Sequence, residues 1–138
     1  MMPSYRQAVC VVDILIESTE KFEHDLDSLG HSEKLMVIEK INQCADLFPN
    51  QKSYVYRKLR RLPLFAGLNG YESSLYTLKI SEKLRAILTV DEDPIFDQVI
   101  FTLFRVVGHD NLDKAYQSIA ESLYQEIAHH GSETATAL

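Results

Sequence analysis

Ser74–Val107, SLYTLKISEKLRAILTVDEDPIFDQVIFTLFRVV, contains the clearest strand pattern of this 138-residue chain. Apolar and other residues alternate in Tyr76–Ile80 and in Leu84–Val90, which predicts two strands that each bury one face. A third strand is predicted over Gln98–Val107, after an acidic connection that contains a proline. Simple alternation places Val99, Phe101, Leu103, Arg105 and Val107 on one face of this strand. We therefore expect a three-stranded meander.

The first turn of this meander brings two cations together. If Ser81–Lys83 forms a three-residue loop, Lys79 on the first strand lies directly opposite Arg85 on the second. Like charges opposite each other destabilise a sheet, so this pairing indicates that an anion, such as a phosphate, belongs between them. In the alternative, both side chains lie over apolar surface with their charged ends in water.

The segments around the meander complete the predicted fold. Ala8–Ile16 is nearly continuous in apolar and β-branched residues, which predicts a buried strand. Two helices follow and should form an antiparallel hairpin, one capped by Thr19 and ending at about Gly30, and one from Ser32 to about Phe48. The apolar stripe of the second helix is predicted to be Leu35, Ile38, Ile41, Ala45 and Phe48, and that of a C-terminal helix to be Leu112, Ala115 or Tyr116, Ile119, Leu123 and Ile127.

The predicted fold class is α+β. An antiparallel sheet, made of the N-terminal strand and the meander, is covered by the helix hairpin and joined by a C-terminal helix. We expect a single domain over residues 1–138, with a core from about 8 to 129 and a disordered tail over 130–138. The chain has no apolar run long enough to span a membrane and no cleavage signal after its N-terminal apolar segment, which predicts a cytoplasmic protein.

Charge is unevenly distributed along the chain. The net charge is −6, which argues against a nucleic-acid partner for the molecule as a whole. However, residues 51–85 contain eight of the 14 basic residues and only two of the 20 acidic ones. This window predicts a phosphate-binding face on an acidic body, and the alternative is an ordinary basic surface loop.

The sequence predicts neither a metal nor a cofactor. His24, Asp25, Asp27 and His31 do not share a helical face and match no ligand spacing, so we expect a solvated surface there. The two cysteines, Cys10 and Cys44, have no metal or redox spacing and are expected to be buried apolar residues.

Several short motifs resemble those of the RelE/ParE toxin superfamily. They are Phe22-x-x-Asp25-Leu26-x-x-Leu29, the step Lys58-Leu59, the paired strands Tyr76-x-Leu78-Lys79-Ile80 and Leu84-Arg85-Ala86-Ile87, and Phe104–Asp110 followed by Tyr116. The resemblance extends over residues 8–125. The chain departs from it in its acidic overall charge, its greater length, and Asp110, which stands where an arginine is expected after the last histidine.

The resemblance implies an activity and a set of site residues. The RNA-cleaving branch of the superfamily acts on mRNA in the ribosome, where a 2′-hydroxyl attacks the adjacent phosphate, and an antitoxin neutralises it. The implied catalytic residues are Arg85, which would stabilise the pentavalent phosphate, Lys79 as a second cation or base, and His109 and Tyr116 as proton-transfer and orienting groups. The implied RNA-binding residues are Arg57, Lys58, Arg60, Arg61, Lys83 and Arg105.

Other interpretations of the same residues stay open at this point. Arg85 could serve structure by pairing with an acidic side chain, Tyr116 lies on an apolar stripe, and His109 could bond to backbone or to Asp110. At the level of function, the alternatives are a ParE-like toxin that binds DNA gyrase, or a regulatory or structural protein with this fold and no toxicity. Whether the chain forms a homodimer is also left open.

Overall fold

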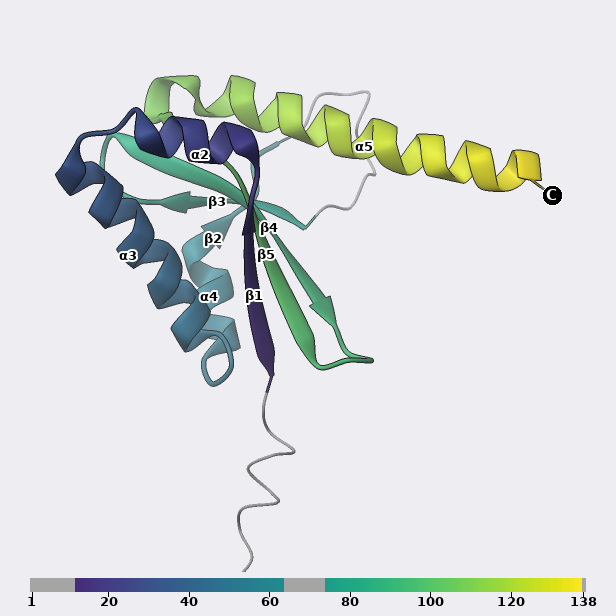
Figure 1. Cartoon of the computed structure of the whole chain (residues 1–138), viewed down its shortest axis with the longest axis horizontal. Coiled ribbons are helices and arrows are strands. Elements are labelled where there is room, and N and C mark those ends of the chain that lie inside the picture. The colour runs from purple at the N-terminus through teal and green to yellow at the C-terminus, as the bar shows by residue number, and fades with distance from the viewer. Residues whose placement is uncertain (1–11, 64–73, 138) are drawn as a thin grey trace, which may run out of the picture.

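The computed structural model describes residues 12–63 and 74–137, and the side chains of residues 12–63 and 74–125. The predicted strand over Ala8–Ile16 therefore lies partly outside the described residues. Its described part was wrongly predicted to be buried, because it lies at an edge of the sheet, where Leu15 and Ile16 are 41% and 42% exposed. In chain order the elements are β1 (Asp13–Ser18), α2 (Glu20–Asp27), α3 (His31–Leu47), α4 (Lys52–Lys58), β2 (Leu59–Arg60), β3 (Leu75–Lys79), β4 (Leu84–Asp93), β5 (Gln98–Gly108), a short 3-10 helix (His109–Asn111) and α5 (Leu112–Ala137) (Figure 1).

The strands form one mixed sheet in the order β1-β5-β4-β3-β2. The predicted meander β3-β4-β5 is confirmed and is antiparallel throughout. The expectation of a wholly antiparallel sheet was wrong, because β1 pairs with β5 in parallel, with Asp13 opposite Gln98 and Ser18 opposite Leu103. The two strands can run in the same direction because residues 19–97 separate them in the sequence, so that no hairpin joins them.

A bulge in β5 changes which of its residues face each side of the sheet. Ile87 is opposite Arg105 and Leu88 is opposite Leu103, so Phe104 is an extra residue in the ladder. Leu103 consequently belongs to one core and Val107 to the other. The prediction that Val99 to Val107 share one face by simple alternation was therefore wrong.

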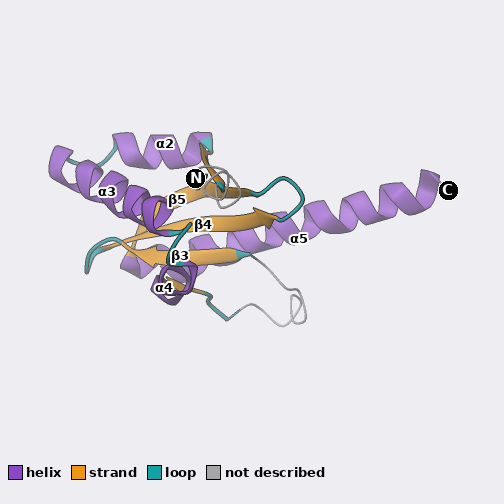
Figure 2. Cartoon of the chain, turned by 90° about the horizontal axis from the view of Figure 1, so that it is seen from below, coloured by secondary structure: helices purple, strands orange, loops and turns teal. Residues whose placement is uncertain are grey.

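Helix α2 covers the part of the β5 edge that β1 leaves unpaired. The predicted cap at Thr19 is confirmed, since its hydroxyl oxygen accepts a bond from the Phe22 N–H at 3.1 Å. The same hydroxyl donates to the Phe104 carbonyl at 3.1 Å, beyond the last β1 pairing. Figure 2 shows α2 beside β5 and α4 beside β3, at opposite ends of the row of strands (Figure 2).

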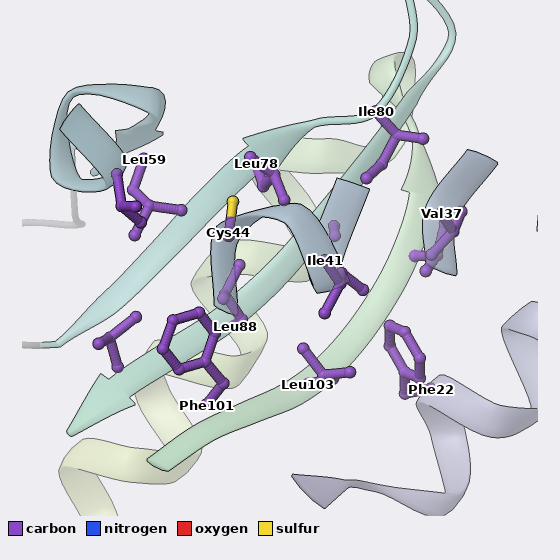
Figure 3. Close-up of a cluster of buried hydrophobic side chains, with 14 of the residues drawn as sticks. Phe22, Val37, Ile41, Cys44, Leu59, Leu78, Ile80, Leu88, Phe101 and Leu103 are labelled. Carbon is purple, nitrogen blue, oxygen red and sulfur yellow. The ribbon is translucent and has the colours of Figure 1, made fainter. Parts of the chain in front are cut away.

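Each face of the sheet has its own core. Helices α2, α3 and α4 pack on one face through Phe22, Val37, Ile41 and Val55, above the strand residues that Figure 3 shows (Figure 3). Helix α5 packs on the other face. Its contacts there are Leu112, Tyr116 and Ala120 against Leu75, Ile87 and Val107.

The buried stripe of α3 differs from the prediction. Its buried residues are Val37, Ile41, Cys44 and Ala45, followed by Phe48 just after the helix, whereas Leu35 and Ile38 are 44% and 39% exposed. The difference arises because α3 crosses the sheet with a narrower face than its apolar residues offer. At the C-terminus, α5 continues through Gly131 to Ala137, where the sequence predicted a disordered tail, and it extends past the sheet (Figure 1).

Candidate functional site

A row of cations crosses strands β4 and β3 and continues to the end of helix α4. The predicted hairpin register is confirmed: Lys79 on β3 is directly opposite Arg85 on β4. Leu59 pairs with Leu78, so Lys58, one residue earlier, comes next to Lys79 on the far side of β3. Lys58 and Lys79 are 21 residues apart in the sequence, and Lys79 and Arg85 are 6 residues apart. Antiparallel pairing brings all three into one row.

These cations surround a hollow of about 340 Å³ on the α5 side of the sheet. The hollow is built from the end of α4, strands β2, β3 and β4, and the start of α5. Thr77 is 5% exposed at its base, and the carbonyl of Arg60 accepts a bond from the Thr77 hydroxyl at 3.4 Å. The lining residues are Lys58, Arg60, Leu62, Thr77, Lys79, Arg85, His109 and Leu112.

The β3–β4 hairpin loop supplies hydrogen-bond acceptors to both Lys79 and Arg85. The Glu82 carboxylate accepts a hydrogen bond from the Lys79 ammonium at 2.7 Å, and this bond lowers the pKa of Glu82. The Arg85 guanidinium donates to the carbonyls of Ser81, Leu84 and Glu82 at 2.5, 3.1 and 3.3 Å. Each of the two cations is thus bonded to groups of the loop between them.

His109 sits at the mouth of this hollow. Its backbone N–H donates to the Lys83 carbonyl at 2.8 Å, which fixes the 3-10 helix against the β3–β4 loop. Its side chain is 62% exposed, and Nδ1 is 4.0 Å from a carboxylate oxygen of Asp110. The side chain of Asp110 is fully exposed and does not line the hollow. Asp110 therefore faces His109 rather than the cations.

Two predicted site residues lie away from this hollow. Tyr116 is 2% exposed in the α5 core, and its hydroxyl donates to the Leu75 carbonyl at 2.9 Å. Arg105 lies on the edge of β5, where Asp25 on α2 accepts hydrogen bonds from its Nε at 2.6 Å and its Nη2 at 3.1 Å. Asp25 also accepts a bond from the Val106 N–H at 3.0 Å, so it is not part of a solvated face as predicted.

The other predicted RNA-binding residues, Arg57, Arg61 and Lys83, do not line this hollow. Arg57 lies with its guanidinium 5.9 Å from the centre of the Tyr54 ring. Arg61 lies over the Tyr76 ring at 5.1 Å and donates to its hydroxyl at 3.1 Å. Lys83 is exposed in the β3–β4 loop and does not line the hollow. Of the predicted site residues, the structure groups Lys58, Arg60, Lys79, Arg85 and His109.

A second hollow, of about 580 Å³, lies between α3, α4 and β3. Lys58, Arg60 and Lys79 line it as well, together with Lys40 and Gln43 from α3. Sequence reasoning missed the two α3 residues, because a lysine and a glutamine on the exposed side of a helix carry no motif. Glu82 was also missed as a partner of Lys79, although its position in the loop between two cations was a usable signal.

An ion-pair cluster fixes α4, which brings Lys58 to the site. Glu92 on β4 pairs with Lys52 and accepts a hydrogen bond from the Tyr56 hydroxyl at 2.7 Å. Partial burial opposes ionisation of Glu92, but these two bonds outweigh it and lower its pKa. Burial and the same bond to Glu92 raise the pKa of Tyr56. Both shifts favour the bonded pair at neutral pH.

Among the side chains that the structure describes, no three or more histidine, cysteine, aspartate or glutamate residues are grouped so that they could hold a metal ion. No helix within the described residues is long and apolar enough to cross a membrane.

The comparisons with known proteins give structural matches only. No protein-family model matches the chain, and no curated protein is similar to it in sequence. One similar solved structure is the toxin–antitoxin complex RelBE2 from Mycobacterium tuberculosis, with a TM-score of 0.44 and 17% identity over 71% of this chain and 100% of that chain. Another is the archaeal RelE–RelB complex from Pyrococcus horikoshii OT3, with a TM-score of 0.45 and 10% identity over 70% of this chain and 96% of that chain. Likeness at this level does not define a function.

Proposed function

We propose that this chain is a RelE-like toxin that cleaves mRNA on the ribosome and is neutralised by an antitoxin. The observation that carries the proposal is the hollow in which Lys58, Arg60, Lys79 and Arg85 meet beside His109. Four cations around one small hollow suit a phosphodiester with its neighbouring phosphates. The exposed imidazole of His109 suits a proton transfer at the same place.

The reaction requires one bond to form and one to break at phosphorus. The 2′-oxygen of a ribose attacks the adjacent phosphorus while the bond to the 5′-oxygen breaks, which yields a 2′,3′-cyclic phosphate and a 5′-hydroxyl. A base must take the 2′-hydroxyl proton, and an acid must give a proton to the leaving 5′-oxygen. Arg85 and Lys79 would stabilise the charge on the equatorial phosphate oxygens.

His109 is the group that we assign to proton transfer in this reaction. It lines the hollow, and its Nδ1 is 4.0 Å from a carboxylate oxygen of Asp110. Glu82 is a poor base because its pKa is lowered, so we assign it the role of a counter-ion for Lys79. Tyr116 takes no part, since its hydroxyl is buried and bonded to Leu75.

The antitoxin would act by covering the cations. A segment with acidic side chains could replace the bond that Glu82 makes with Lys79, and it would exclude RNA from the same row. Such segments are commonly disordered before they bind.

A second candidate is a protein that binds its target without cleaving it, such as a ParE-like toxin that blocks DNA gyrase. The observation that favours it is the burial of Tyr116, which keeps this residue away from the hollow. Among the described residues, His109 is then the group at the hollow that we assign to proton transfer. Cleavage needs both an acid and a base, whereas binding needs neither.

The experiment compares growth and mRNA integrity after induced expression of four proteins: the wild type, Arg85→Ala, His109→Ala and the control Lys21→Ala. Lys21 is an exposed cation on α2, on another part of the surface, so its loss changes the net charge as much as the loss of Arg85 does. We expect growth arrest with new mRNA 5′ ends for the wild type and Lys21→Ala. Cleavage should fall by about 10²-fold or more for Arg85→Ala and for His109→Ala.

Binding of purified protein to single-stranded RNA gives a second readout. Four phosphate contacts predict that log K falls against log salt concentration with a slope of about −3. Glu82→Gln should tighten binding at low salt, because it frees Lys79. Arrest without new 5′ ends would favour the gyrase-binding candidate. Cleavage by wild type that survives Arg85→Ala would overturn the proposed site, and a well-folded wild type that causes no arrest would overturn the proposed toxicity.

A further inference from the structure

The larger hollow differs chemically from the first. Its floor is apolar and belongs to the core in Figure 3, where Cys44 of α3 lies beside Leu78 of β3 (Figure 3). Burial raises the pKa of Cys44, so its thiol stays neutral and acts as a small apolar group. The floor residues are Cys44, Leu47, Val55, Leu78 and Ile80.

The rim of this hollow is cationic. Five of its lining side chains are basic and none is acidic, in a molecule with an excess of acidic residues. The basic residues are Lys40, Arg57, Lys58, Arg60 and Lys79, and the amide of Gln43 lies among them. A small inorganic anion would use the rim but not the floor. A ligand that uses both has a flat apolar part and a negative charge, and a nucleotide has this combination.

The two hollows meet at an open edge of the sheet. Strand β2 pairs with β3 only at Leu78 and Thr77, so the edge of β3 is unpaired from Lys79 onward. Leu78 and Ile80 point to the larger hollow, and Thr77 points to the smaller one. Lys58, Arg60 and Lys79 line both. A phosphate chain that crosses this edge would stay in contact with cations from one hollow to the other.

We propose that the hollow between α3, α4 and β3 is a binding site for the nucleotide next to the phosphate held at Arg85. Its base lies on the apolar floor and its phosphate contacts the cationic rim, while the Gln43 amide can bond to the edge of the base. This inference rests on the proposed RNA substrate, and it assigns the path of the strand over the edge of β3. The volume of about 580 Å³ is in the range of sites that enclose small ligands.

The test fills the hollow from its exposed side and compares RNA with and without bases. Gln43→Trp places a bulky side chain in the hollow from an exposed helix position, and Asn42→Trp, its neighbour outside the lining, is the matched control. The probes are a labelled ten-residue uridylate strand and a ten-residue strand of abasic ribose phosphates. Fluorescence anisotropy gives Kd for each pair.

We expect wild type and Asn42→Trp to bind the uridylate strand about tenfold more tightly than the abasic strand. This is the difference in Kd that the stacking of one base typically gives. Gln43→Trp should bind both strands with similar, weaker affinity. Gln43→Glu, which adds a negative charge without bulk, should also weaken uridylate binding. Circular dichroism and urea unfolding of each variant confirm that it is folded.

The outcomes separate this inference from the proposed function. Equal preference for the uridylate strand in wild type and Gln43→Trp would overturn the nucleotide site and leave RNA binding intact. Wild type that binds neither strand would overturn both. If Gln43→Trp abolished binding of an acidic peptide but left RNA binding unchanged, the hollow would be a protein-binding site and the inference would be wrong.

Discussion

Asp25 joins α2 to the unpaired part of β5, and its replacement by alanine should be the most destabilising change at this edge. The carboxylate accepts two bonds from Arg105 and one from the Val106 N–H, and its side chain is only 14% exposed. Alanine would leave a half-buried guanidinium without its partner and the N–H of a buried residue without an acceptor. Bonds to charged groups contribute about 1.5–3 kcal/mol each when buried. Arg105 is 32% exposed, so we expect a total loss of about 3 kcal/mol.

Two further variants divide this loss among the bonds. Arg105→Ala removes the ion pair but leaves the bond from Val106 to Asp25, so it should cost less, about 1–1.5 kcal/mol. Asp27→Ala is the control, because its carboxylate is 78% exposed and lies 3.6 Å from the Lys34 ammonium. An exposed ion pair of this kind contributes less than about 0.5 kcal/mol.

Urea unfolding at pH 7, with the free energy extrapolated to water, measures all three values. The double variant of Asp25 and Arg105 completes a cycle that should give a coupling energy of about 1–2 kcal/mol. The reasoning would be refuted if Asp25→Ala and Asp27→Ala differed by less than about 0.5 kcal/mol. RNA affinity provides an independent check, since Arg105→Ala should change Kd by less than twofold. A tenfold loss of RNA affinity would instead show that Arg105 contacts RNA.

Two other predictions concern the core and the pH dependence of stability. Tyr116→Phe should cost about 1 kcal/mol in urea unfolding, from the lost bond to Leu75, and leave RNA cleavage within twofold of wild type. A large loss of cleavage at unchanged stability would restore Tyr116 as a catalytic group. The lowered pKa of Glu92 means that its carboxylate stabilises the fold above pH 4.5 and loses this effect as the pH falls below that value. Glu92→Gln should therefore cost about 0.5–1 kcal/mol at pH 7 and less at pH 3, and an equal cost at both pH values would contradict this account.

Local patterns determined the meander and its register. Alternation over Tyr76–Ile80 and Leu84–Val90, with three residues between them, was enough to place Lys79 opposite Arg85. The cap at Thr19 was equally readable, because a cap depends on one side chain and the first turn of its own helix. The same local logic failed at Phe104, since a bulge depends on how two strands fit each other and leaves no mark in the alternation of one strand.

The candidate site was predicted in part. Lys79 lies opposite Arg85 as the hairpin pattern predicted, and His109, which was assigned by resemblance, lines the same hollow because the chain turns there after β5. Tyr116 and Arg105 were assigned to the site by resemblance, but the structure gives them other partners. Both partners, Leu75 and Asp25, lie at least 41 residues away in the sequence, and no local pattern could identify them.

The sequence alone thus determined the elements whose formation depends on near neighbours: the meander, the first helix cap and the cluster of basic residues. The tertiary structure decided the parallel pairing of β1, the burial of Tyr116, the pairing of Arg105 with Asp25, and the larger hollow lined by Lys40 and Gln43. The physical reason is that periodicity and capping are properties of short segments, whereas a parallel strand pair, a buried hydrogen bond and a hollow each depend on surfaces that meet only when distant segments pack together.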